Sequence, residues 1–308
     1  MKKTMIIAAL LLVATSLSAR GLGQTRYFFS GDGKINIVGA KNGISFNGTY
    51  RLADGTYDPS AMEKIHSVFS AKYGIPGSEI STRFIEYLDY IQDHYNPKAK
   101  ITIISGYRSP SYNTGLRNKG RLAAKASLHQ YGMAADIKID GVRAEDLWHF
   151  IRENNFGGAG YYHGTSVHVD SGPARFWDET TSGVGTDISD DNKLIEIVLD
   201  KDIYKPGETI KVRLTRATLF PVSASPNFSL EELSRSDKWK LKKTIRAKFS
   251  SNSGAECVSM KNIDEMTGIS LDLPEKISSG RYRISVGFCG EMPESMPAIK
   301  ESAAFEIR

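Results

Sequence analysis

The segment SLHQYGMAAD, residues 127–136, places a histidine and an aspartate on either side of a glycine. Asp136 follows His129 by seven residues and opens the stretch DIKID, residues 136–140. Ile137 and Ile139 alternate there with polar side chains, which predicts a strand with one buried face. A turn and a strand that bring an imidazole and a carboxylate together are typical of a metal site or a catalytic pair.

A later segment, GAGYYHGTSVHVDSG at residues 158–172, supplies another histidine. Its alternation predicts a strand in which Ser166, His168 and Asp170 point to one face while Val167 and Val169 pack on the other. A zinc ion that catalyses hydrolysis takes about three protein ligands and leaves one position for water. The histidine of this strand therefore completes a candidate set of three ligands with the pair in the first segment.

These two segments, together with SGYRSPSYNTGLR at residues 105–117, resemble the zinc peptidases of the D-alanyl-D-alanine carboxypeptidase and hedgehog type, and especially their murein endopeptidase K subgroup. The resemblance covers residues 59–178. It implies a small antiparallel sheet with flanking helices, a zinc cofactor, and peptides of the bacterial cell wall as substrates. The family signature S-x-H-x-x-G-x-A-x-D, with a later histidine in a short strand, is filled here by Ser127, His129, Gly132, Ala134, Asp136 and His168.

The resemblance also implies roles for single side chains. His129, Asp136 and His168 match the zinc ligands of the family. Arg108 matches the arginine that faces the scissile carbonyl, where a fixed guanidinium stabilises the oxyanion. Ser127 would hydrogen-bond the substrate or hold the ligand residues in place.

The general base is the point at which the chain departs from better-known enzymes of this type. Those enzymes carry a histidine or glutamate two or three residues before the last metal ligand, where this chain has Ser166 and Thr165. The murein endopeptidase K subgroup also lacks that upstream histidine. Two candidates remain, Asp170 and His163. Strand geometry favours Asp170 as the base, with a hydrogen bond to a ligand histidine as its alternative role.

The rest of the N-terminal half is predicted from turn and helix signals. Residues 21–58 read as a β-hairpin extension that turns at Lys41-Asn42-Gly43. Helices are expected from Asp58 to Gly74, from Ser81 to Pro97 and over residues 143–154, with a buried strand at 101–105 and a polar loop after it. His66, His94 and His149 fall on these helices among aromatic residues, which favours structural roles.

The composition and the hydrophobic pattern of the sequence change after Trp177. Residues 179–192 are polar and contain Gly and Ser, which predicts a linker. Alternating segments then predict an all-β sandwich over residues 193–308. Cys257 and Cys289, the two cysteines of the chain, are expected to form a disulfide in this domain. The overall expectation is an α+β peptidase domain, residues 59–178, followed by the sandwich.

The N-terminus indicates export. Residues 1–20 carry two lysines, a short apolar run and small residues, as a signal peptide does, and the run is too short to span a membrane. The expected location is therefore periplasmic or secreted, with no stable membrane insertion after cleavage of the signal. A net charge of +5, without a dense basic and aromatic patch, argues against a nucleic-acid partner.

The predicted function is hydrolysis of peptide bonds in peptidoglycan cross-links by a zinc-dependent peptidase. Two alternatives stay open. One is a D,D-carboxypeptidase that trims terminal D-residues, and the other is a zinc-stabilised cell-wall-binding module without turnover.

Overall fold

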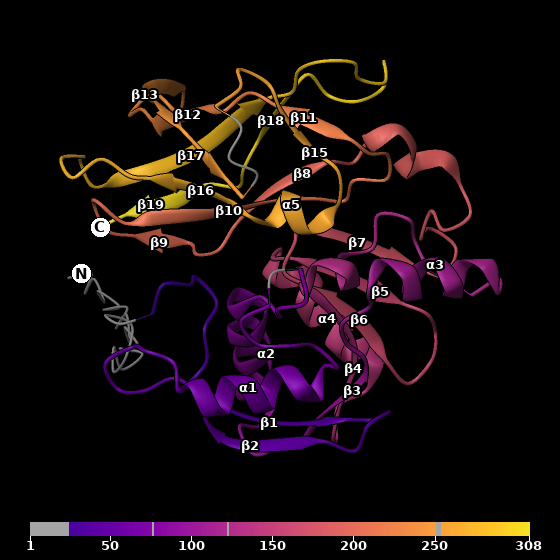
Figure 1. The fold of residues 1–308 in the computed structure, drawn as a ribbon. Coiled ribbons are helices and arrows are strands. Elements are labelled where there is room, and N and C mark those ends of the chain that lie inside the picture. The colour runs from indigo at the N-terminus through magenta and orange to yellow at the C-terminus, as the bar shows by residue number, and fades with distance from the viewer. Residues whose placement is uncertain (1–24, 76, 122, 251–253) are drawn as a thin grey trace, which may run out of the picture.

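The computed structural model describes residues 25–75, 77–121, 123–250 and 254–308. The expected signal peptide, residues 1–20, lies outside the described residues. An N-terminal region, residues 25–178, combines a sheet with helices, and a C-terminal region, residues 193–308, consists mostly of strands (Figure 1). The predicted order of an α+β region followed by a mainly β region is confirmed.

The N-terminal region is built on one seven-stranded sheet with the order β2-β1-β3-β4-β6-β5-β7. Its central pairs are antiparallel, but β1 runs parallel to β3 and β5 runs parallel to β7. The sheet is therefore mixed and larger than the small antiparallel sheet that was expected. Its strands are β1 (Lys34–Gly39), β2 (Ser45–Thr49), β3 (Ile101–Ser105), β4 (Ala134–Ile139), β5 (Gly158–Tyr161), β6 (Val167–Asp170) and β7 (Arg175–Asp178).

The predicted N-terminal hairpin is present, but it is part of the main sheet. Strands β1 and β2 pair around the Lys41-Asn42-Gly43 turn, in which Gly43 has a φ of 67°. Strand β1 then pairs with β3 through Ile37 opposite Ile101. Because the side chains of Ile35 and Ile37 are buried in the main core, the hairpin contributes to the same hydrophobic cluster as the rest of the sheet.

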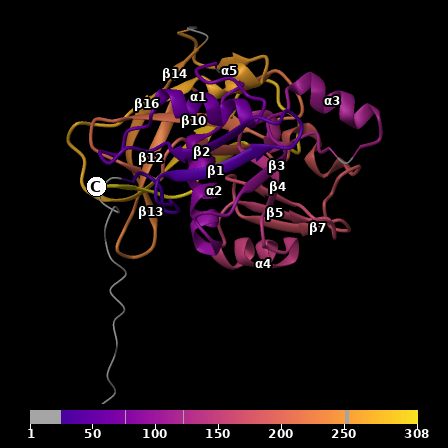
Figure 2. The same cartoon turned by 90° about the horizontal axis from the view of Figure 1, so that it is seen from below.

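Helices α1 (Pro59–Val68), α2 (Thr82–Tyr95) and α4 (Ala144–Asn154) pack on the core of this sheet (Figures 1 and 2). Helix α1 ends at Val68, well before Gly74, because Ser70 takes a left-handed φ of 60°. The segment expected to be a polar loop contains helix α3 (Pro110–Asn118). It begins as helices often do, with Ser109 accepting a hydrogen bond from the Tyr112 amide and a proline in the first turn.

The C-terminal region has a four-stranded sheet with the order β14-β16-β10-β8 and a six-stranded sheet. Five strands of the six-stranded sheet follow the order β13-β12-β17-β19-β9, and the sixth strand, β18, pairs with β17. Buried residues from both sheets share one hydrophobic cluster. The elements are β8 (Glu196–Leu199), β9 (Ile203–Tyr204), β10 (Thr209–Thr215), β11 (Val222–Ala224), β12 (Asn227–Leu233), β13 (Trp239–Arg246), β14 (Lys248–Phe249), β15 (Val258–Met260), α5 (Ile263–Thr267), β16 (Ile269–Asp272), β17 (Gly280–Gly287), β18 (Ile299–Glu301) and β19 (Phe305–Ile307).

The expected disulfide between Cys257 and Cys289 is present, with the two Cα atoms 6.0 Å apart. It joins the start of β15 to the residues that follow β17. Among the described residues, no helix has the length and apolar character needed to cross a membrane.

The two regions are in direct contact. Arg83 on α2 forms an ion pair of 2.6 Å with Asp202, and both side chains are almost completely buried. A small apolar cluster combines Leu128, Tyr131 and Met133 with Val198 and Ile263 of the C-terminal region. The predicted linker, residues 179–192, is folded here and contains the 3₁₀ helix η2 (Asp187–Asn192). Its Asp190 accepts two hydrogen bonds from Lys125.

Candidate metal centre

Three short elements bring His129, Asp136 and His168 together. The 3₁₀ helix η1 (Leu128–Tyr131) carries His129, while Asp136 on β4 lies directly opposite His168 on β6. Gly132 ends η1 with a left-handed φ of 63°, and a Cβ atom there would lie 1.9 Å from the carbonyl oxygen of Glu79. This position therefore requires glycine, which explains why the predicted motif contains one.

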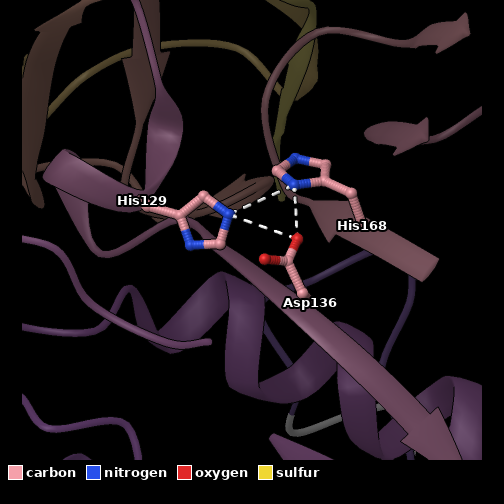
Figure 3. A group of neighbouring side chains, drawn as sticks. All are labelled: His129, Asp136 and His168. Carbon is pink, nitrogen blue, oxygen red and sulfur yellow. Dashed lines mark hydrogen bonds and ion pairs between the residues drawn. The ribbon is translucent and has the colours of Figure 1, made fainter. Parts of the chain in front are cut away.

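The donor atoms of the three side chains face one another (Figure 3). Nε2 of His129 lies 3.2 Å from Nδ1 of His168 and 3.5 Å from Oδ1 of Asp136. The same Oδ1 lies 3.2 Å from Nδ1 of His168. Tetrahedral zinc, with bonds of about 2.0–2.1 Å, places its N and O ligands about 3.3–3.4 Å from one another. The three separations fit a tetrahedral ion with one position left open.

The outer nitrogen of each imidazole has its own acceptor. Nδ1 of His129 lies 2.8 Å from the carbonyl oxygen of Gly106, and Nε2 of His168 lies 3.1 Å from Oδ2 of Asp170. Each outer ring N–H donates a hydrogen bond to its acceptor, so that the lone pair of the other nitrogen points into the cluster. This pairing fixes the tautomer that a metal ligand needs.

Burial and charge favour a cation between these side chains. Burial lowers the pKa of His129 more than the charge of Asp136 raises it, which favours the neutral imidazole. Burial would raise the pKa of Asp136, but the charges and hydrogen bonds of the two histidines hold it well below its usual range. For His168, burial acts in the lowering direction, yet the hydrogen bonds with Asp136 and Asp170 raise its pKa overall. The ionised Asp136 carboxylate therefore sits between two imidazoles, where a bound cation would take the place of the shared protons.

Asp170 is fully buried and held on several sides. It accepts hydrogen bonds from the backbone amides of Gly158 and Gly172, and Nη2 of Arg175 lies 2.7 Å from its Oδ2. Burial raises its pKa, but Arg175 and His168 lower it by more, so it stays ionised. Its carboxylate faces Nε2 of His168, on the side of the ring away from the cluster. Asp170 therefore contacts His168 on the side of the ring away from Asp136 and His129.

Of the other predicted site residues, Arg108 and Ser127 line the cleft beside the cluster, whereas His163 does not. Arg108 donates from Nη2 to Oδ2 of Asp136 at 2.7 Å and from Nε to Ser105, and it lines the same cleft as the cluster. Ser127 immediately precedes η1 and also lines this cleft. His163, the other candidate for the base, is exposed and packs on the Tyr161 ring outside the cleft lining.

The cleft in front of the cluster has a volume of about 420 Å³. Its lining includes Tyr162, Phe176 and Trp177 from the N-terminal region. The lining also includes Thr181 to Val184 and Ile188 from the predicted linker, and Arg216 from the C-terminal region. Sequence reasoning did not anticipate this part of the lining, because a polar segment carries no local signal that it folds back over a distant site.

A second acidic group, Asp32, Asp89 and Asp93, also brings three carboxylate oxygens within 4.8 Å of one another. Its members come from the start of the hairpin and from α2. It offers carboxylates only, and two of its oxygens, Oδ1 of Asp89 and Oδ1 of Asp93, are buried without a hydrogen-bond partner among the described residues. The histidine-containing cluster is the better candidate for zinc, which prefers nitrogen ligands to an all-oxygen set.

The chain is similar in sequence to known peptidoglycan endopeptidases. A family model described as peptidoglycan L,D-endopeptidase MepK matches residues 34–177, beginning at the first residue of β1. The peptidoglycan L,D-endopeptidase MepK of Escherichia coli (strain K12) is 35% identical over 122 residues, which cover 39% of this chain and 67% of that protein. A probable peptidoglycan L,D-endopeptidase MepK of Haemophilus influenzae is 31% identical over 137 residues, covering 44% of this chain and 73% of that protein.

Two solved structures give only weak overlays. A structure of the superantigen toxic shock syndrome toxin-1 has a TM-score of 0.23 at 12% identity and covers 37% of this chain and 97% of that one. The sporulation control protein Spo0M from Bacillus subtilis has a TM-score of 0.21 at 13% identity and covers 37% of this chain and 48% of that one. Scores this low carry no argument about the fold. The family model, by contrast, spans His129, Asp136 and His168. The chain belongs to the murein endopeptidase K subgroup of the D-alanyl-D-alanine carboxypeptidase-type zinc peptidases.

Proposed function

We propose that this protein is an exported, zinc-dependent endopeptidase that hydrolyses peptide bonds in peptidoglycan cross-links. The observation that carries the proposal is the arrangement of His129, Asp136 and His168, whose donor atoms are 3.2–3.5 Å apart. The substrate class follows from the relatives, which are named peptidoglycan L,D-endopeptidases. Export is supported by the signal-like residues 1–20 and by the Cys257–Cys289 disulfide, which is typical of proteins outside the cytoplasm.

The three ligand side chains would hold the zinc ion, and each would do so in a defined protonation state. Gly106 and Asp170 accept hydrogen bonds from the outer N–H groups of the two imidazoles, and Arg108 donates to the second oxygen of Asp136. When bound, zinc supplies a Lewis acid and lowers the pKa of water to about 7.

Arg108 is placed to stabilise the oxyanion that develops on the scissile carbonyl. Its guanidinium lines the cleft, and two of its nitrogens are fixed by Ser105 and Asp136. A donor that is already oriented pays no reorganisation cost during the reaction. Ser127, which lines the same cleft, would hydrogen-bond the peptide backbone of the substrate.

We assign Asp170 as a positioning residue for His168. Among the described residues that line the cleft, Asp136 is the one carboxylate, and it belongs to the metal cluster. Asp170 would therefore act by orienting His168, and we assign no carboxylate of this cleft as the general base.

Digestion of purified peptidoglycan tests the function. The zinc-loaded protein should release fragments that mass spectrometry identifies as cut within the peptide cross-link. The chelator-treated protein and the Asp136→Ala variant should release none, whereas His163→Ala should digest as the unmodified protein does. Release of single terminal residues would indicate a carboxypeptidase instead. Stoichiometric zinc without any product would indicate a binding module.

A further inference from the structure

The cleft lining includes Arg216, a residue from outside the region that the family model matches. Arg216 directly follows β10, and its φ of 63° lies in the left-handed region that residues with side chains seldom adopt. Two hydrogen bonds hold this turn against η1. Nη1 of Arg213 donates to the carbonyl oxygen of Tyr131 at 2.7 Å, and the Ala217 amide donates to the Tyr131 hydroxyl at 3.2 Å. The turn that carries Arg216 is thereby fixed to the helix that carries His129.

Arg216 has a positive charge without an anionic partner among the described residues. Its Nε is buried and makes no hydrogen bond there. The two nearby carboxylates are already paired, Glu196 with Lys300 at 3.1 Å and Asp170 with Arg175 at 2.7 Å. Burial and the charge of Arg175 lower the pKa of Arg216 to about 10, so that it remains charged at neutral pH.

Arg175 and Arg216 both line the cleft that also contains His129, Asp136 and His168. Arg175 uses both terminal nitrogens on Asp170, so it contributes mainly its electric field. Arg216 has its guanidinium free to bind. A partly buried guanidinium with an unused donor is suited to a carboxylate, which it can bind through two parallel hydrogen bonds.

We propose that Arg216, supported by the field of Arg175, forms a subsite for a free carboxylate of the peptide substrate. The inference rests on the proposed function and deepens it. The C-terminal region would then complete the active-site cleft and select anionic peptides. Uncharged peptides with the same scissile bond would bind without this contact.

A matched pair of peptides tests the subsite. Both contain the same L,D cross-link-type peptide bond, and one carries a free carboxylate beside it where the other carries an amide. Arg216→Gln should reduce kcat/KM for the carboxylate peptide by about 10- to 100-fold, the effect of losing a charge-assisted hydrogen bond. The amidated peptide should be cleaved at an unchanged rate. Arg281→Gln removes the same charge from an exposed position in the same region and should behave as the unmodified protein.

Binding to the chelator-treated protein gives a second measurement that does not depend on turnover. The unmodified protein should bind the carboxylate peptide more tightly than its amide, and Arg216→Gln should remove that difference. Equal affinity for the two peptides, or equal losses on both in the Arg216→Gln variant, would overturn the subsite. If the zinc-loaded protein cuts neither peptide, the proposed endopeptidase activity fails, and the binding comparison alone decides the subsite.

Discussion

Oδ2 of Asp170 lies 3.1 Å from Nε2 of His168, while Nδ1 of the same ring faces Oδ1 of Asp136 at 3.2 Å. The imidazole is therefore held between two carboxylates that have different roles. Asp136 faces the ring nitrogen that would bind the metal, and Asp170 accepts a hydrogen bond from the N–H group on the other side of the ring. An imidazole oriented in this way binds a metal more tightly, because its tautomer and its plane are already fixed.

Replacement of Asp170 by Asn distinguishes a positioning residue from a general base. Because Asn lacks the negative charge, Asp170→Asn should weaken zinc affinity by about 10- to 100-fold. Activity should fall at limiting zinc and recover as zinc approaches saturation. Competition with a fluorescent chelator gives the affinity, and peptide release gives the activity. Unchanged zinc affinity with activity that is lost at saturating zinc would restore Asp170 as the base.

Arg108→Lys should keep the metal and lose most of the activity. Lysine retains the positive charge but cannot contact Ser105 and Asp136 while also facing the oxyanion. We expect kcat to fall by about 10²-fold, as when one oxyanion donor is removed. Zinc content is measured on the same samples by elemental analysis. Arg121→Lys, at an exposed position outside the cleft, is the matched control, and an Arg108→Lys enzyme as active as that control would contradict the assigned role.

Asp89 gives the folded protein a predictable pH dependence. Burial raises the pKa of this carboxyl to about 8, although its Oδ2 accepts hydrogen bonds from Tyr50 and the Gly33 amide. The unfolded chain loses the proton near pH 4, whereas the folded chain keeps it up to about pH 8. The folded state therefore binds more protons in this window, and its stability falls as the pH rises through it.

Asp89→Asn removes this penalty, since the amide oxygen can accept the same two hydrogen bonds. The variant should melt several degrees higher than the unmodified protein at pH 8, because a gain of about 1–2 kcal/mol shifts Tm by that amount. At pH 4 the two proteins should melt at nearly the same temperature. Glu294→Gln at an exposed site should show no such difference. Destabilisation by Asp89→Asn at pH 8 would mean that the folded protein needs the ionised carboxylate.

The Cys257–Cys289 disulfide should stabilise the C-terminal region independently of the metal site. The cysteines are 32 residues apart in sequence, and closing a loop of that size is worth about 3–4 kcal/mol in the chain-entropy model. Reduction should lower the Tm of that region and leave zinc affinity unchanged. A Cys257→Ala, Cys289→Ala double variant should melt at the reduced temperature with or without reductant. A reduced protein that melts at the oxidised temperature would contradict this account.

The ligand cluster could be predicted because its signal is local. The alternation around His168 fixes which side chains share a strand face, and the Gly132 position fixes the turn that presents His129. For Asp170 the same alternation is less informative. A two-residue period places Asp170 on the face of His168, but it does not tell which side of the imidazole ring the carboxylate contacts.

The remaining differences arise from tertiary contacts. Nothing in the hairpin sequence shows that Ile37 pairs with Ile101 in a parallel register. Residues 179–192 read as a linker because their composition is polar, yet the Lys125–Asp190 ion pair holds them beside the cleft. Arg216 follows an ordinary alternating strand, and the contacts of its turn with Tyr131 hold it beside the cleft. Each of these contacts joins residues that are far apart in the chain.

Titration of zinc into the chelator-treated protein tests the central claim most directly, with bound metal and released cross-link fragments measured on the same samples. The account predicts that bound zinc and activity rise together and both saturate at about one zinc per chain. His129→Ala should show neither stoichiometric zinc nor cleavage. Peptide cleavage by the protein before any zinc is added, or full zinc occupancy and activity in His129→Ala, would contradict the assignment of His129, Asp136 and His168 as the catalytic zinc site.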